Sequence, residues 1–208
     1  MLTVRVDSSL IPGVNAPIPF DALLSAVEPV LGQTGRIVTA VRINGVEEPA
    51  FREGDILARV LVDDDDVDVE TTAVRTMAVE SLDQALHFIP TLSSGARAVA
   101  GELRGAQADA ARPALGTLAD NLALLMALVH TADLWARQAG LAATDWLGED
   151  VAAVERVAST LVEASEAGDW VSAADALEYD LPEALDAWQT RLSAGRVEVE
   201  ALETATTA

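Results

Sequence analysis

Residues 36–46 read RIVTAVRINGV, an alternating run that ends in an Asn-Gly pair. Every second residue from Ile37 to Ile43 falls on one face, which is the period-two pattern of a half-buried strand. Asn44-Gly45 followed by Val46 is a strong short-range signal for a β-hairpin, because Asn and Gly tolerate the positive φ angles of its turn. The stretch therefore predicts a strand, a tight turn and a second strand.

The segments around this hairpin predict a small sheet with one helix. Residues 2–6 alternate as a strand, residues 20–31 carry apolar side chains at helical spacing after Pro19, and residues 67–71 alternate again. This order resembles the β-grasp arrangement of ubiquitin-like domains. The resemblance implies a docking module, and it does not imply sulfur carriage or conjugation, because the unit lacks a free Gly-Gly end and runs on through Glu70.

Beyond about Thr72 the apolar pattern changes from strand period to helical period. Residues 115–129, 151–161 and 170–192 each carry a seam of apolar side chains at spacings of three and four. Pro90 predicts a helix end, Pro182 predicts a kink, and the close pair Gly101 and Gly105 predicts tight helix packing.

We therefore expect an α+β chain with three parts. These are a β-grasp-like unit over residues 1–73, an all-α antiparallel helical bundle over 74–195 and a disordered tail over 196–208. We expect an exposed linker between Asp63 and Thr76, where the periodicity changes.

Charge limits the classes of partner. The chain has 34 acidic and 13 basic residues, a net charge of -21, and every basic residue is an arginine. Such a surface disfavours nucleic acid and anionic membranes, which bind clustered Lys and Arg. The acidity serves either solubility in a salty cytoplasm or docking of a basic partner. We also expect like-charge crowding to raise carboxylate pKa values.

The residues give little support to catalysis or to a bound cofactor. The absence of Cys excludes disulfides, thiolate chemistry and Cys-ligated metals, and no phosphate-binding or nucleophile motif is present. The run Asp63–Asp66 lacks the Gly and distal Glu of a calcium loop and reads as a solvated turn. His87 and His130 lack the repeated Glu-x-x-His pairs of di-metal bundles. We expect no enzyme activity, no metal and no cofactor, with a metal-dependent hydrolase as the weakest alternative.

Aromatic residues are the candidate partner contacts. All four Trp lie in the helical half, and Trp146 falls between two glycines in a connection, where an amphipathic ring is suited to contact a protein. Core packing is the competing interpretation, above all for Trp188, which fits its seam. The candidate contacts are Trp146, Trp170, Tyr179 and Trp188.

The segment AGDWVSAADALEYDLPEALDAW, residues 167–188, resembles uncharacterised bacterial proteins that join a β-grasp-like unit to a helical bundle. More distantly it is similar to acidic helical chaperones of flagellar and secretion systems. The resemblance implies a cytoplasmic adaptor or chaperone-like protein that holds an amphipathic helix of a client protein in a bundle groove. A self-associating structural or assembly protein, such as a homodimer, is the alternative. The N-terminus lacks a signal sequence, and the apolar run 122–129 is too short to span a membrane, so we expect a cytoplasmic location.

Overall fold

The chain is α+β, as its sequence predicts. The computed structural model describes residues 1–105, 111–141, 146 and 150–202. It divides into two compact units, residues 1–76 and 77–208, each with its own hydrophobic core. The elements are, in chain order, β1 (Thr3–Val6), β2 (Ser9–Leu10), β3 (Ile18–Pro19), α1 (Phe20–Gln33), β4 (Arg36–Ile43), β5 (Val46–Glu47), α2 (Gly54–Leu57), β6 (Val60–Leu61), β7 (Asp66–Ala73), α3 (Val74–Leu103), α4 (Arg112–Gln138), α5 (Asp150–Ala167), α6 (Trp170–Asp175), a π-helical segment (Ala176–Asp180) and α7 (Leu181–Ala201).

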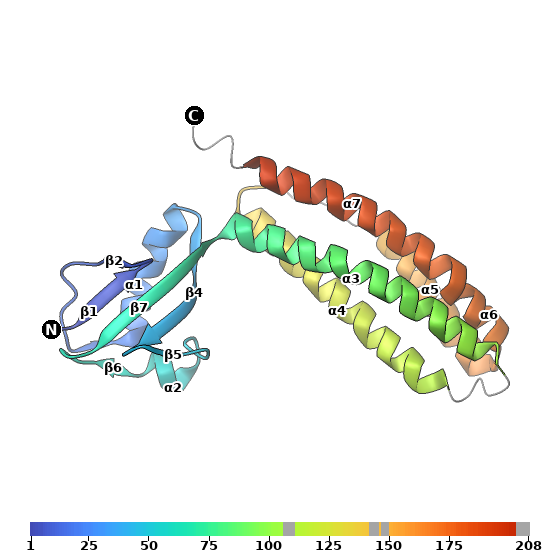
Figure 1. The fold of residues 1–208 in the computed structure, drawn as a ribbon, viewed down its shortest axis with the longest axis horizontal. Helices are drawn as coiled ribbons and strands as arrows, with labels where there is room; N and C mark the ends of the chain where they lie inside the picture. The colour runs from blue at the N-terminus through green and yellow to red at the C-terminus, as the bar shows by residue number, and fades with distance from the viewer. Residues whose placement is uncertain (106–110, 142–145, 147–149, 203–208) are drawn as a thin grey trace. The chain divides into compact units, whose positions relative to one another are not determined.

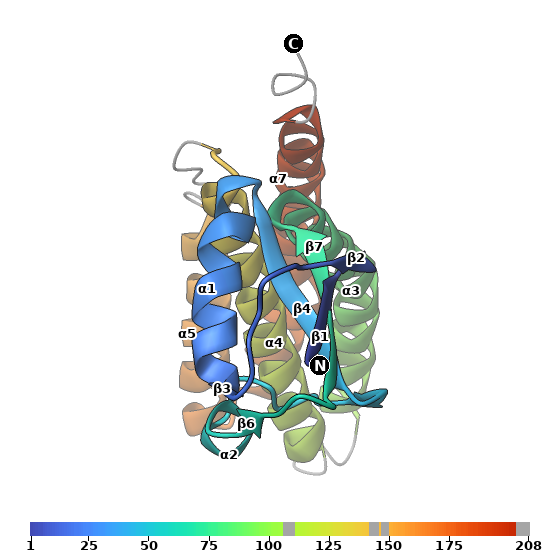
Figure 2. The same ribbon diagram turned by 90° about the vertical axis from the view of Figure 1, so that its left-hand side faces the viewer.

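The N-terminal unit has the strand order of a β-grasp sheet. Its five-stranded sheet runs β2-β1-β7-β4-β5, with β1 parallel to the central β7 and the other pairs antiparallel. Helix α1 lies against one face of this sheet (Figures 1 and 2). Its buried residues Phe20, Leu23 and Leu24 meet strand residues such as Val41 and Val69, which are also buried. The alternation of the strands therefore gives the unit one apolar face and one charged face.

The β4–β5 hairpin forms at the predicted turn, but the face of β4 changes along its length. Asn44 and Gly45 have φ angles of 55° and 78°, the positive values that a type I′ turn needs. A bulge between Val38 and Ala40 places one extra residue, Thr39, against β7. Val38 is consequently buried and Thr39 exposed, so the prediction that every second residue from Ile37 faces the core is wrong before the bulge.

The acidic run before β7 is anchored rather than fully solvated, and no linker follows it. The Asp65 carboxylate accepts hydrogen bonds from the Val62 backbone N–H at 2.8 Å and from Asn44 Nδ2 at 2.7 Å. These bonds lower the pKa of Asp65, so crowding does not raise it as expected. Residues 66–73 form the central strand, and α3 begins directly at Val74, which is buried. The predicted exposed linker between Asp63 and Thr76 is therefore wrong.

The second unit is a helical bundle in which α3, α4, α5 and α7 lie side by side (Figure 1). Two ion pairs tie the end of the chain to α3: Arg196 of α7 pairs with Asp83 of α3, and Asp175 at the end of α6 pairs with Arg104, the residue after α3. Because residue numbers run in opposite directions between these pairs, the stretch from α6 to α7 is antiparallel to α3. Their core is filled by residues such as Leu82, Ile89, Leu92, Leu185, Trp188 and Leu192.

Two predicted helix ends differ in the structure. Helix α3 continues through Pro90 to Leu103, because Pro90 is exposed while Ile89 and Leu92 beside it are buried in the core. Helix α7 continues through residues 196–201, which the sequence assigned to a disordered tail. Val199 is fully buried and Arg196 pairs with Asp83, so packing extends this helix. Residues 203–208 lie outside the described residues.

The predictions for Gly101 and Pro182 also need correction. A Cβ added at Gly101 meets no atom within 4 Å, and one at Gly105 meets only the nearby Glu102 backbone. Among the residues that the structure describes, no other helix therefore lies within 4 Å of a Cβ built at either glycine. Pro182 lies in the first turn of α7, and the irregularity falls just before it, in the π-helical segment 176–180.

Candidate protein-binding groove

The α4 seam supplies one wall of a groove because only part of it enters the core. Pro113 lies in the first turn of α4. Backbone N–H groups in this turn have no intrahelical acceptor, so a proline, which has no N–H, costs the helix no hydrogen bond there. Leu118, Leu125 and Val129 are at most 4% exposed. Leu115 and Leu122 of the same predicted seam are only partly buried. The seam therefore has leucine surface left over after the bundle has packed.

Helix α5 supplies the opposite wall in the same way. Val157 and Ala164 are buried, whereas Val154 and Leu161 are only partly buried, and Val162 is 58% exposed. Two helices that each bury half of an apolar stripe leave a channel between the remaining halves.

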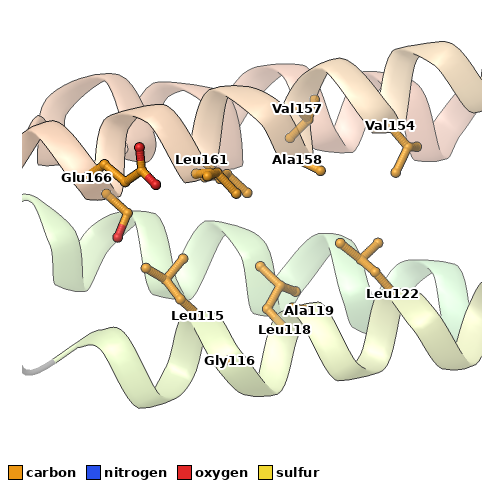
Figure 3. Close-up of a pocket in the computed structure, with 12 residues that line it drawn as sticks. Leu115, Gly116, Leu118, Ala119, Leu122, Val154, Val157, Ala158, Leu161 and Glu166 are labelled. Carbon is orange, nitrogen blue, oxygen red and sulfur yellow. The ribbon is translucent and has the colours of Figure 1, made fainter.

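This channel is an apolar groove of about 390 Å³. Ten of its twelve lining residues are apolar or glycine: Leu115, Gly116, Leu118, Ala119, Leu122, Val154, Val157, Ala158, Leu161 and Val162. Figure 3 shows the leucines of α4 pointing toward α5, with Ala158 and Leu161 of α5 facing them across the gap. The two polar lining residues are Ser165 and Glu166, and Figure 3 places Glu166 at one end of the groove. Such a surface suits an apolar stripe of another segment and offers few groups for catalysis.

Two of the four predicted aromatic contacts are in the core. Trp188 is fully buried in the bundle, and Trp146 is 8% exposed. A Cβ added at Gly195 would lie 2.9 Å from Trp146 Nε1, so the Trp146 ring rests against α7 where glycine leaves room for it. The bundle already covers the apolar surface of these two rings, which favours the competing interpretation that they pack in the core.

The other two aromatic residues lie outside the groove lining. Trp170 is partly buried, and the Arg112 guanidinium stacks 5.5 Å from its ring centroid. Tyr179 is 61% exposed in the π-helical segment. The groove is lined instead by leucines and valines that the sequence assigned to core seams. The sequence signal that could have found them is the low charge of α4, which has only Asp120 between Arg112 and Asp133.

Comparison with known proteins places this bundle in a family. A family model described as a domain of unknown function, DUF8042, matches residues 80–191, which is more than half of the 208-residue chain. The chain belongs to the DUF8042 family. No curated protein and no solved structure matches it significantly. The matched DUF8042 region begins in α3 and ends in α7, so it contains every residue of the groove and leaves out the β-grasp unit.

A second cavity, of about 510 Å³, lies in the DUF8042 region between α5 and α7. Its walls are more polar and include Arg156, Thr160, Asp180 and Glu183. Helix α5 thus has an apolar channel on one side and a polar one on the other. The basic residue Arg156 faces away from the apolar groove.

The predicted metal candidates are dispersed. His87 is exposed, with its Nδ1 2.7 Å from the backbone carbonyl of Asp83, and His130 is exposed on α4. Among the residues that the structure describes, no three His, Cys, Asp or Glu side chains gather in a way that could hold a metal ion.

One described helix of the DUF8042 region, α4, is long and apolar enough to cross a membrane by length and composition. Its most apolar window is 17% buried inside the bundle. The sequence prediction considered only the uninterrupted run 122–129, which is shorter than this window. An apolar helix with little burial exposes hydrophobic surface to solvent. On α4 this exposed hydrophobic surface continues into the groove.

Proposed function

We propose that this chain is a non-enzymatic adaptor or chaperone-like protein that holds an amphipathic helix of a partner protein in the groove between α4 and α5. The observation that carries the proposal is the leucine and valine surface of the two seams, which the bundle leaves partly uncovered. An amphipathic helix inserts apolar residues at spacings of three and four into such a channel.

The dimensions and lining of the groove support a helix as its occupant. Lining residues extend from Leu115 to Leu122 on α4 and from Val154 to Glu166 on α5, about three helical turns along α5. Gly116, Ala119 and Ala158 are small, and a Cβ at Gly116 would meet no atom within 4 Å. Partner side chains therefore have open space above these positions, and helix backbones can approach closely there.

The charge of the chain supports a protein partner rather than nucleic acid or an anionic membrane. A net charge of -21 repels phosphate-rich ligands, as the sequence analysis predicts. A cytoplasmic location remains part of the proposal, because adaptors and chaperones of this kind meet their clients there.

A photo-crosslinking experiment tests the proposal. A benzoylphenylalanine placed at Ala119, which is exposed on the groove wall, is compared in native lysate with one at Ala194, which is exposed on α7 away from the groove. We expect the probe at Ala119 to crosslink to one amphipathic segment of a partner. Replacing the partly buried Leu161 by aspartate, Leu161→Asp, should abolish this crosslinked product. Equal crosslinking from both positions, or products insensitive to Leu161→Asp, would contradict the proposal.

Self-association is a second candidate, favoured by the outward face of α4. Leu124 and Leu134 are 52% and 53% exposed on this helix. Two copies could cover these leucines against each other. Light scattering tests this: a dimer in wild type that becomes a monomer in Leu134→Asp supports self-association, whereas a monomer at high concentration excludes it.

A further inference from the structure

We propose that the helix held in the groove is cationic, with Lys or Arg beside its apolar stripe, and that one of these cations pairs with Glu166. This inference rests on the proposed function and specifies the chemistry of the partner. It depends on the position of Glu166 and on the sign of the charges around the groove.

Of the described residues that line the groove, Glu166 is the one with a charged side chain. Figure 3 places Glu166 on α5 at one end of the channel, beyond Leu161. Its side chain is exposed, and within the described part of the chain it takes part in no ion pair. By contrast, carboxylates elsewhere, such as Asp83 and Asp175, are paired with arginines. Glu166 is therefore available to a cation supplied by a bound segment.

Most charges beside the groove are negative; the exception is Arg112, one turn before Leu115 on α4, whose guanidinium stacks on Trp170. Glu155 and Glu163 are exposed on α5, and Asp120 is exposed on α4. The nearest arginine in sequence on α5, Arg156, lines the opposite cavity and does not neutralise this side. A segment that enters the groove therefore passes several carboxylates before its apolar stripe is buried.

This arrangement distinguishes between possible occupants. A second copy of the chain carries the same net charge of -21, so its approach to this rim is opposed by like charges. An acidic or neutral helix would fill the apolar channel and leave Glu166 without a counterion. A cationic amphipathic helix can pack its apolar stripe against the leucines and pair a Lys or Arg with the Glu166 carboxylate, so charge complementarity favours it.

Three designed 18-residue peptides test the inference by fluorescence anisotropy with the full chain. One has a leucine stripe at helical spacing with lysine flanks, the second has the same stripe with glutamate flanks, and the third has the lysine composition in scrambled order. The protein variants are wild type, Glu166→Lys, Glu163→Lys and Leu161→Asp. Glu163→Lys is the matched control, because it makes the same charge change on an exposed α5 residue outside the groove lining.

We expect wild type to bind the lysine-flanked peptide best. Glu166→Lys should weaken that binding on the order of 3- to 10-fold, in the range of an exposed ion pair converted to a repulsion, and Glu163→Lys should weaken it less. Equal binding of lysine- and glutamate-flanked peptides, both abolished by Leu161→Asp, would overturn the charge inference and leave the groove function standing. Equal weakening by Glu166→Lys and Glu163→Lys would also overturn it, since net charge alone would explain the binding. If Leu161→Asp affects no peptide, both proposals fail.

Discussion

Gly195 is the position at which one methyl group most directly tests the packing of the bundle. An added Cβ would lie 2.9 Å from Nε1 and 3.0 Å from Cε2 of the Trp146 ring, distances that real Cβ atoms rarely reach. In an open helix interior, Gly→Ala stabilises by about 1 kcal/mol, because alanine loses less backbone entropy. Overpacking a close contact costs about 1–3 kcal/mol. Gly195→Ala should therefore be neutral to destabilising, by up to about 2 kcal/mol.

A double-mutant cycle isolates the contact. In a Trp146→Ala background the obstruction is gone, and Gly195→Ala should stabilise by about 1 kcal/mol. Gly95→Ala in α3 is the matched control, because a Cβ there meets no atom within 4 Å, and it should stabilise by about 1 kcal/mol in either background. Urea unfolding followed by circular dichroism at the helix band gives the free energies. If Gly195→Ala stabilises wild type as much as it stabilises Trp146→Ala, Trp146 does not pack against α7 and this reasoning is refuted.

Further expectations concern the core, the acidic turn and the net charge. Leu125→Ala should destabilise the bundle by about 2–5 kcal/mol in urea unfolding, and its exposed neighbour Leu124→Ala by less than about 0.5 kcal/mol; equal effects would contradict the burial of α4. The pKa of Asp65 is lowered on folding, so its contribution to stability is present above the unfolded pKa of about 3.9 and is lost as pH falls through the folded value. Thermal melts between about pH 5 and 2 should therefore fall more steeply for wild type than for Asp65→Asn, and parallel curves would argue against this anchor. The melting temperature should rise as salt is added from near zero, because screening weakens repulsion within a chain of net charge -21, and a flat response would exclude that repulsion.

Local chemistry decided which parts of the fold were predictable. The Asn44-Gly45 turn follows from two residues that tolerate positive φ, and the helix after Pro19 follows from apolar spacing, so both could be read from the sequence. The bulge at Thr39 could not, because it depends on how β4 pairs with β7, about thirty residues away. Pro90 was misleading for a related reason: tertiary packing on both sides of it keeps α3 helical.

The candidate site was harder to predict, because a seam shows that residues are apolar but not what covers them. Leu118 and Leu122 belong to one periodic stripe, yet only Leu118 is fully covered by the bundle. Trp146 lies in a stretch with no periodicity, so its contact with Gly195 depends on a distant helix. Exposure is a property of the assembled bundle, and the best sequence signal for it was the low charge of α4.

The π-helical segment before α7 makes the last helix tolerant of a change in length. A π turn holds about one residue more than an α turn, and both flanking elements keep helical backbone angles at Asp175 and Leu181. The apolar faces before and after the segment, around Ala174 and Leu185, therefore both reach the core despite the extra residue. Removing one exposed residue such as Tyr179 would turn the segment into an ordinary α turn and keep both faces inward. The same deletion in the middle of α7 would rotate every later side chain by about 100°. The π-helical segment is thus a place within the last helical stretch where we expect a single-codon deletion to leave the core packing unchanged.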